Sequence, residues 1–278
     1  MNIFSTFIKP EKFHIGLKDL SDVNFSLFYD YRPSEHELSI SPLNVLIVSE
    51  PNEYFGNHDW AIQHKDYFSL ILTWSDKVLK NCDNSSFLVY GESWFDDKHI
   101  FEDGTKNAKK RNKKFTVSFL RGNKLQSIGH AIRHEIFSRQ DEIKVPKEFW
   151  TQLGNLNDFS TMKDTKEDSF GKYQFSICIE NNSREGYFTE KITDCIMCKT
   201  IPIYYGCSNI GDYYNKDGII QFQNADQAIK LINQLTPDYY NDRLNIIEEN
   251  YQRAFEYRDY IQTINKTLTN IFKQNNII

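Results

Sequence analysis

Seven short apolar runs, each followed by a polar or helix-patterned segment, constrain the fold of this chain more than any other feature. The segments after residues 174–179 and 219–222 carry apolar residues at helical spacing. Buried strands that alternate with helices predict an α/β fold in which the strands of each sheet run parallel. The predicted strands are LNVLIVSE (43–50), FSLILTW (68–74), SSFLVYG (85–91), FTVSFL (115–120), and residues 174–179, 201–205 and 219–222.

A hydrophilic stretch at residues 96–114 divides the chain into two halves. It contains Gly104 and ends in a basic run, which we interpret as a solvated linker. The sequence therefore predicts two Rossmann-like domains, 1–110 and 111–278, that face one another across a cleft. Because so little chain precedes the second domain, we expect a reduced N-terminal sheet. The apolar spacing from Asn241 onward predicts a long C-terminal helix.

Composition and charge narrow the class of protein. Hydrophobic residues make up 40% of the chain and aromatic residues 15%, which is enough for a buried core. The net charge of −5 gives no overall attraction for nucleic acid or for an anionic membrane, and no aromatic residue interleaves with the basic run at 106–114. No window approaches the roughly 20 apolar residues of a membrane span, and MNIFSTFIKPEKFHIG lacks a signal-peptide pattern. We therefore expect a cytoplasmic protein with no membrane span that binds no nucleic acid.

Neither the cysteines nor the histidines have the spacing of a metal site. The five cysteines are few and odd in number, which argues against a disulfide framework. Cys195 and Cys198 lie on a predicted helix, where we interpret them as core residues rather than as zinc ligands. His130 and His134 are four residues apart on another predicted helix, but they lack the H-E-x-x-H pattern. We therefore predict no metal site.

The loop ENNSREGYFTEKI (180–192) places many polar side chains directly after a predicted strand. In parallel sheets, ligands bind beyond the carboxyl ends of the strands, where loops lead into helix N-termini. Thr189 can cap the next helix, whose free N–H groups favour a phosphate, and Lys191 adds positive charge. Glu190 can accept hydrogen bonds from sugar hydroxyls, and Tyr187 offers a ring face. The loop predicts a site for a phosphorylated sugar such as a sugar nucleotide, although a capped helix of this kind can also be purely structural.

Residues 172–235 resemble the signature of the α1,3/α1,4-fucosyltransferase family. The resemblance implies a GT-B fold and an enzyme that transfers L-fucose from GDP-β-L-fucose to a hydroxyl of a glycan, with inversion at the anomeric carbon. It also implies that the donor binds mainly to the C-terminal domain and the oligosaccharide acceptor mainly to the N-terminal domain. The matching residues are Phe175, Glu180, Asn181, Tyr187, Thr189, Glu190, Lys191, Ile192 and Thr200 to Gly206.

The resemblance also assigns donor-binding roles. The family places an arginine that faces the diphosphate on the first helix of the C-terminal domain. Arg133 on the predicted helix is the candidate that we prefer, with Arg121 and Lys124 as alternatives. These cations can neutralise the diphosphate directly, so no cofactor is required, although Mg²⁺ or Mn²⁺ could stimulate the reaction. The motif residues expected around the fucose, ribose and diphosphate are Glu180, Asn181, Tyr187, Glu190 and Lys191.

Direct displacement requires a carboxylate that takes the proton of the acceptor hydroxyl. The family's proposed base is a glutamate just after a strand of the N-terminal domain, and VLIVSEPNEYF has this form. Glu50 is therefore the candidate base, and Glu53, Glu92 and Asp59 are its rivals.

Two other functions stay open at this stage. The same fold and motif could serve another sugar nucleotide, because sugar choice depends on a few pocket residues. The chain could also be a non-catalytic nucleotide- or glycan-binding module, for which Glu50 would be dispensable. No pattern in the sequence indicates the acceptor glycan or the linkage that is formed.

Overall fold

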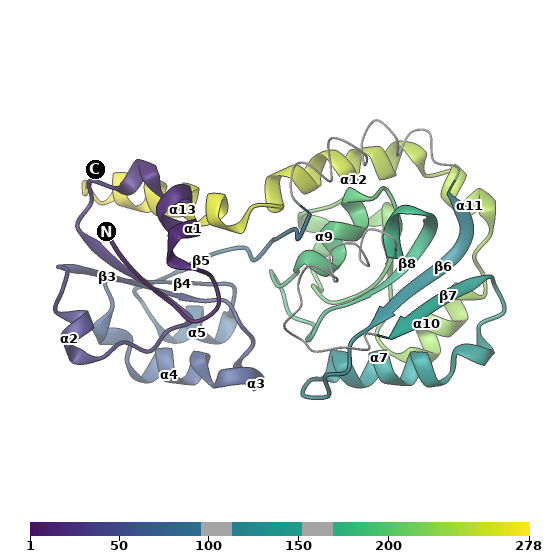
Figure 1. Cartoon of the computed structure of the whole chain (residues 1–278), viewed down its shortest axis with the longest axis horizontal. Helices are drawn as coiled ribbons and strands as arrows, with labels where there is room; N and C mark the ends of the chain where they lie inside the picture. Colours follow the sequence, from purple (N-terminus) through teal and green to yellow (C-terminus); the bar gives the residue numbers. More distant parts are fainter. Residues whose placement is uncertain (96–112, 152–168) are drawn as a thin grey trace. The chain divides into compact units, whose positions relative to one another are not determined.

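The computed structural model describes residues 1–95, 113–151 and 169–278 (Figure 1). The chain forms two compact units, one of Met1–Tyr90 with Asp259–Ile278 and one of Gly91–Arg258. Within the described residues, each unit contains a five-stranded sheet whose paired strands are all parallel. The prediction of a parallel α/β fold is confirmed. Most of the predicted linker at 96–114 lies outside the described residues.

The sheet of the first unit follows the order of the chain, β1-β2-β3-β4-β5. Its described part has five strands, although the sequence predicted a reduced sheet, because two short strands near the N-terminus were not recognised. The strands are β1 (Asn2–Ser5), β2 (Phe25–Tyr29), β3 (Leu43–Val48), β4 (Leu70–Thr73) and β5 (Ser85–Phe87). The helices are α1 (Pro10–Gly16), η1 (Lys18–Leu20), α2 (Glu35–Leu38), α3 (Asn52–Phe55), α4 (Asn57–Gln63), η2 (Lys65–Tyr67) and α5 (Asp76–Asn81).

Both faces of this first sheet are covered by helices, which explains why its central strands are apolar at successive positions. Along β3, Val45 and Ile47 belong to one apolar cluster, whereas Leu46 and Val48 belong to another. Figure 1 shows α1 and α13 (Tyr260–Gln274) over one face and α4 and α5 over the other.

The C-terminal helical pattern divides into two helices that belong to different units. Helix α12 (Leu244–Tyr257) ends before Arg258, and Asp259 then caps α13 by accepting a hydrogen bond from the backbone N–H of Gln262 at 3.0 Å. The sequence analysis placed this segment in a domain of residues 111–278. The structure instead groups Asp259–Ile278 with the first unit. The reason is the apolar stripe of α13, which joins the core around β2 through Tyr260, Ile264, Leu268 and Phe272.

The second unit has the strand order β10-β9-β8-β6-β7. The chain therefore moves from β6 outward to β7, then returns to the other side of β6 at β8 and continues outward to β10. The strands are β6 (Lys114–Arg121), β7 (Lys147–Thr151), β8 (Tyr173–Ile179), β9 (Ile201–Tyr205) and β10 (Ile220–Gln221). The helices are α7 (Ile128–Ser138), η4 (Gln140–Glu142), α9 (Glu190–Met197), η5 (Ile210–Asp212), η6 (Lys216–Gly218), α10 (Ala225–Ile232), α11 (Pro237–Asn241) and α12.

This order creates a topological switch point between β6 and β8. In open α/β sheets, ligands bind beyond the carboxyl ends of the two strands at such a point, because the loops that follow them diverge to opposite faces. The loop after β6 leads into α7, and the loop after β8 leads into α9. Figure 1 shows α7 and α10 on one face of the sheet and α9 and α12 on the other. Among the described residues, no helix is long and apolar enough to cross a membrane.

Candidate functional site

The first turn of α7 packs directly against the loop that follows β8. The backbone N–H of Gly129 donates to the carbonyl of Asn181 at 3.1 Å. A Cβ atom on Gly129 would lie 1.8 Å from the carbonyl oxygen of Glu180, so only glycine permits this approach. The two loops of the switch point are thus locked together at the start of α7.

The start of α9 is fixed by a buried carboxylate. Thr189 donates to the side chain of Glu180 twice, from its backbone N–H at 2.8 Å and from its hydroxyl at 2.7 Å. Glu180 is fully buried. Glu180 therefore orients the N-cap of α9, and its carboxylate does not face solvent. The sequence had grouped it with the donor-binding residues.

Lys191 lies beside this carboxylate. Its Nζ is 3.5 Å from Oε2 of Glu180, 3.1 Å from Oε1 of Glu190 and 2.9 Å from the hydroxyl of Thr189. Burial opposes the charge on this ammonium, but the two carboxylates prevail and raise the pKa of Lys191. Burial raises the pKa of Glu180, against the effect of Lys191. Lys191 is thus a fixed cation at the start of α9, and 24% of its side chain is exposed.

Arg133 connects α7 to the end of β8. Its guanidinium donates to the carbonyl of Ile179 through Nε at 3.1 Å and also through Nη2, and Nη2 donates to Oδ1 of Asn181 at 3.0 Å. The structure therefore brings together two candidates that the sequence placed far apart in the chain, and it positions the preferred arginine beside the motif loop.

Arg121 and Lys124, the two alternative cations, have different surroundings from Arg133. The guanidinium of Arg121 lies 4.5 Å from the ring centroid of Phe137 and 2.8 Å from Nδ1 of His134, further along α7. Lys124 is exposed in the loop before α7. Neither has a described hydrogen bond to the motif loop.

His130 lies close to the positive charges at this site. Its Nδ1 accepts from the backbone N–H of Ser127 at 3.2 Å, and it completes the N-terminal cap of α7. Burial and the nearby charges of Arg133 and Lys124 lower the pKa of His130 to about 4. The charge of Lys191 acts in the same direction. Cations from two helices therefore converge at the switch point, as a diphosphate site requires.

Tyr187 and Glu190 lie deeper than the sequence suggested. Tyr187 is 2% exposed and Glu190 is 7% exposed. The ring face that the sequence offered to a ligand is therefore covered by protein in this conformation. Asn181 is half-buried at the same edge. Asn181 is therefore the most accessible of these three side chains.

Glu50 follows β3 in the first unit, at the carboxyl edge of that sheet. Its backbone N–H and that of Ser49 both point to Oδ1 of the buried Asp30, at 3.4 and 3.0 Å. The hydroxyl of Ser49 also donates to this carboxylate. Burial raises the pKa of Asp30, although these hydrogen bonds oppose the change. The sequence analysis missed Asp30, whose signal was its place directly after the apolar run FSLFY.

The backbone carbonyls of Ser49 and Glu50 are also held by hydrogen bonds. The indole of Trp74 donates to the carbonyl of Ser49 at 2.6 Å, and Nε2 of His58 lies 2.9 Å from the carbonyl of Glu50. Burial lowers the pKa of His58, so its neutral ring donates through Nε2 and accepts from the hydroxyl of Ser75 at Nδ1, 2.9 Å away. The backbone of the candidate base is therefore held by residues that follow β2 and β4 and by His58 on α4.

The rivals of Glu50 lie in different surroundings. Asp59 forms an ion pair with Lys77 and accepts from Asn52 at 2.8 Å, and these two contacts lower its pKa. Glu53 is exposed on α3, and Glu92 is half-buried at the start of the second unit. Only Glu50 combines a strand end with a backbone fixed on both sides among these four carboxylates.

Within residues 1–95, 113–151 and 169–278, no group of three or more His, Cys, Asp or Glu side chains could hold a metal ion. Cys195 is buried and its thiol donates to the carbonyl of Thr200 at 3.4 Å. This contact gives Cys195 a place in the packing beneath α9.

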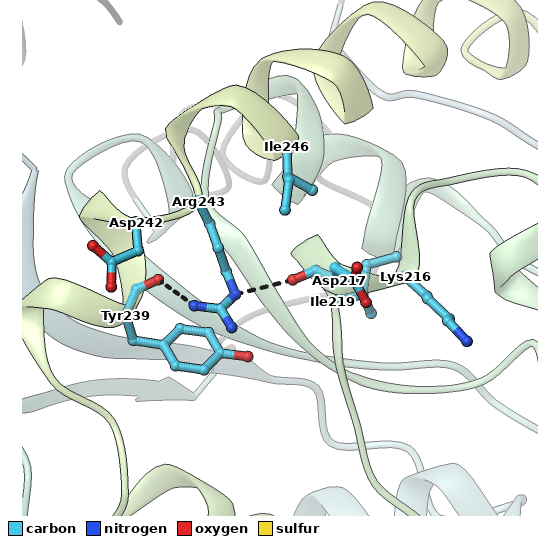
Figure 2. Close-up of a pocket in the computed structure, with 7 residues that line it drawn as sticks. All are labelled: Lys216, Asp217, Ile219, Tyr239, Asp242, Arg243 and Ile246. Carbon is cyan, nitrogen blue, oxygen red and sulfur yellow. Dashed lines mark hydrogen bonds between the residues drawn. The ribbon is translucent and has the colours of Figure 1, made fainter.

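A separate pocket opens at the other end of the second sheet. Figure 2 shows Arg243 between Tyr239 and Asp217, with hydrogen bonds to both backbone carbonyls at 3.0 and 3.1 Å. The pocket is lined by η6, which precedes β10, so it lies at the amino edge of the sheet. The donor-site candidates lie at the carboxyl edge, and the two sites are therefore distinct.

The fold is that of known nucleotide-sugar-dependent transferases. A crystal structure titled α1,3-fucosyltransferase aligns with a TM-score of 0.57 at 16% identity, over 94% of this chain and 92% of that one. A structure of α1,3-fucosyltransferase with GDP-fucose aligns at 0.54 with 17% identity over 92% and 91% of the two chains. Anabaena Alr3699/HepE with UDP-glucose aligns at 0.56 with 10% identity over 94% and 82%. At these identities the likeness shows the fold, which is GT-B-like, as the sequence predicted.

The family follows from the sequence comparison. The family described as glycosyltransferase family 10 (fucosyltransferase) C-term matches residues 109–276, more than half of the chain. The chain belongs to glycosyltransferase family 10, and the resemblance found in the sequence is confirmed. The α-(1,3)-fucosyltransferase FucT of Helicobacter pylori is 33% identical over 98 residues, which are 34% of this chain and 20% of that protein.

A second relative matches this chain over a similar number of residues. The putative fucosyltransferase R654 of Acanthamoeba polyphaga mimivirus is 32% identical over 92 residues, which are 32% of this chain and 15% of that protein. The matching part thus spans about a fifth or less of the length of these curated relatives.

Proposed function

We propose that this chain transfers L-fucose from GDP-β-L-fucose to a hydroxyl of a glycan acceptor, with inversion at the fucose anomeric carbon. One observation carries the donor half of the proposal. Arg133 on the second turn of α7 and Lys191 on the first turn of α9 lie on the two helices that follow β6 and β8, near enough for their charges to interact. The charge of a nucleoside diphosphate matches this pair of cations, which supports a phosphate-bearing donor at this edge of the sheet.

The donor roles can be refined by the burial of each side chain. Lys191 and Arg133 would neutralise the diphosphate as GDP leaves. Asn181 would accept from or donate to a hydroxyl of the sugar or ribose, and Glu190 would accept from a hydroxyl once the loop adjusts. Tyr187 would act by packing beneath the loop, because its ring is buried.

The acceptor half of the proposal assigns the base to Glu50. The acceptor oxygen attacks the anomeric carbon, its proton passes to the carboxylate of Glu50, and the bond between that carbon and the GDP oxygen breaks. The electron pair of this bond leaves with GDP, where the fixed cations receive the charge. The chain's own positive side chains supply this neutralisation, and added Mg²⁺ or Mn²⁺ would at most stimulate.

A panel of sugar nucleotides tests the proposal. The full chain is incubated with GDP-fucose, GDP-mannose, UDP-galactose, UDP-N-acetylglucosamine or CMP-sialic acid, each with mixed lactose and N-acetyllactosamine acceptors and with EDTA or Mn²⁺. We expect GDP release from GDP-fucose that depends on the acceptor. Release from another donor would keep the phosphate site and overturn the fucose assignment. A product of α configuration by NMR would support inversion, and a β-fucoside would contradict it.

A further inference from the structure

Two large aromatic side chains are exposed at the edge of the first sheet that also carries Glu50. Phe7 is 49% exposed and Phe55 is 47% exposed. Their ring centroids are 5.3 Å apart and their planes are inclined by 43°. Phe7 follows β1, and Phe55 ends the short helix α3 that follows β3. Because β1, β2 and β3 run parallel, the chain leaves all three strands at the same edge of the sheet.

The backbone beneath both rings is firmly held. The residue before Phe7, Thr6, donates from its N–H to the carbonyl of Tyr29 at 3.2 Å and from its hydroxyl to the carbonyl of Asp30 at 2.6 Å. The carbonyl of Phe55 accepts from the guanidinium of Arg32. The rings are therefore exposed on an ordered backbone, which distinguishes them from apolar side chains at a frayed terminus.

A chain of hydrogen bonds links this aromatic pair to the candidate base. Nε of Arg32 donates to Oδ1 of Asn57 at 3.3 Å. Nδ2 of Asn57 donates to Oδ1 of Asp30 at 3.5 Å, and the same oxygen accepts from the backbone N–H of Glu50. Phe55 and the base are thus linked through the carboxylate of Asp30, and the backbone carbonyl of the same residue holds Thr6, the residue before Phe7.

We infer that Phe7, Phe55 and Arg32 form a subsite for a neutral hexopyranosyl unit of the acceptor glycan, an inference that rests on the proposed transfer. The C–H groups on one face of a pyranose are weakly positive and match the negative face of an aromatic ring. Arg32 is exposed and carries N–H donors for the hydroxyls at the rim of the sugar.

The charge of the surroundings favours a neutral sugar over a phosphorylated ligand. Glu53 is exposed on the same short helix as Phe55, and Glu50 precedes that helix. Two carboxylates beside the platform repel a phosphate or a carboxylated sugar, whereas they accept hydrogen bonds from sugar hydroxyls. An aromatic pair bordered by a few placed polar groups can pack against the face of a sugar and bind its hydroxyls.

Ligand-observed NMR tests the subsite without requiring turnover. Saturation transfer from the full chain is measured to lactose, N-acetyllactosamine, maltotriose, chitotriose and mannotriose, for the wild type and for Phe7→Ala and Phe55→Ala. Tyr67→Ala is the matched control, since Tyr67 is 52% exposed in η2, which precedes β4 at the opposite edge of the same sheet. We expect transfer to at least one glycan, loss of roughly tenfold in affinity in each Phe variant, and no change in Tyr67→Ala.

A kinetic measurement separates the subsite from the proposed function. With an acceptor that supports turnover, each Phe variant should raise the acceptor KM about tenfold, leave the GDP-fucose KM unchanged, and keep kcat within about twofold. Wild-type turnover combined with an unchanged acceptor KM in both Phe variants would overturn the subsite and leave the proposed function standing. Glycan binding that needs the two rings, without turnover of any sugar nucleotide, would retain the subsite and reject the transferase. Failure of the wild type to bind any of the five glycans would overturn the subsite.

Discussion

Glu180 and Thr189 are joined by two hydrogen bonds that close the loop at residues 180–192 on itself, with the carboxylate of Glu180 accepting from both the N–H and the hydroxyl of Thr189. The eight residues between the two positions belong to the loop that the sequence motif spans. Part of the polar motif thus holds the start of α9, and other residues of the motif are those that we propose for the donor site.

Replacement of Glu180 by alanine should destabilise the second unit. The change leaves the buried N–H of Thr189 without its acceptor and removes one carboxylate from Lys191, so we expect a loss of about 3 kcal/mol in the free energy of unfolding. Urea unfolding measures it. Glu185→Ala is the control, because Glu185 is exposed in the same loop and should change stability by less than about 0.5 kcal/mol. Equal stability of the two variants would contradict the positioning role.

His130 should report the binding of a diphosphate. Its pKa of about 4 lies below the ordinary 6.5, so the unfolded chain takes up the proton first and stability falls as the pH drops from about 6.5 towards about 4. Bound GDP offsets the charges of Arg133 and Lys191 and should raise this pKa. NMR titration of the imidazole protons with and without GDP measures the change, and exposed His36 in the other unit serves as the internal control. A pKa of His130 that does not respond to saturating GDP would place the diphosphate elsewhere.

Replacement of Glu50 by glutamine should separate chemistry from donor binding. The amide keeps the shape of the side chain but cannot take a proton, so we expect kcat to fall at least about 100-fold while GDP affinity stays unchanged. Steady-state kinetics and calorimetry with GDP measure the two quantities. Glu53→Gln is the matched control on α3, three residues further along the chain. Turnover near the wild-type level in Glu50→Gln would show that another group is the base.

Asp30 should affect turnover through the backbone of Glu50. Asp30→Ala removes the acceptor of two backbone N–H groups and of the Ser49 hydroxyl, so we expect a loss of about 2 kcal/mol in stability and a kcat reduced more than GDP affinity. Asp30→Asn retains one acceptor oxygen and should recover part of kcat. If Asp30→Ala lost stability alone and kept the wild-type kcat, the buried carboxylate would support the fold without positioning the base.

The sequence analysis identified seven of the ten described strands, and it missed β1, β2 and β7. Residues 201–205 and 174–179 match β9 and β8 closely, because both lie buried between layers of helices. Residues 25–29 form β2, which is buried at every position but contains Ser26 and was not recognised as a strand. β7 carries Lys147 and Glu148 at a sheet edge, where polar residues are tolerated and periodicity is weak.

The sequence also does not show against which of the two units an amphipathic helix packs. Tyr260, Ile264, Leu268 and Phe272 predict a buried stripe, but the stripe is equally suited to either unit. The sequence motif likewise does not show which of its residues are buried. It contains Glu180, Tyr187 and Lys191, and only the structure shows that Glu180 and Tyr187 are buried whereas the side chain of Lys191 is partly exposed.

Gly129 should be indispensable to the donor site, because it lets α7 approach the motif loop. In Gly129→Ala the new methyl group would meet the carbonyl of Glu180 at 1.8 Å, a distance that forces the two segments apart. We expect GDP affinity to fall roughly tenfold or more and stability to fall by about 1–3 kcal/mol. Calorimetry with GDP and urea unfolding measure these changes. Gly211→Ala is the matched control, since its methyl group would only touch Lys216 at 3.8 Å. GDP affinity at the wild-type level in Gly129→Ala would mean that the first turn of α7 does not hold the diphosphate.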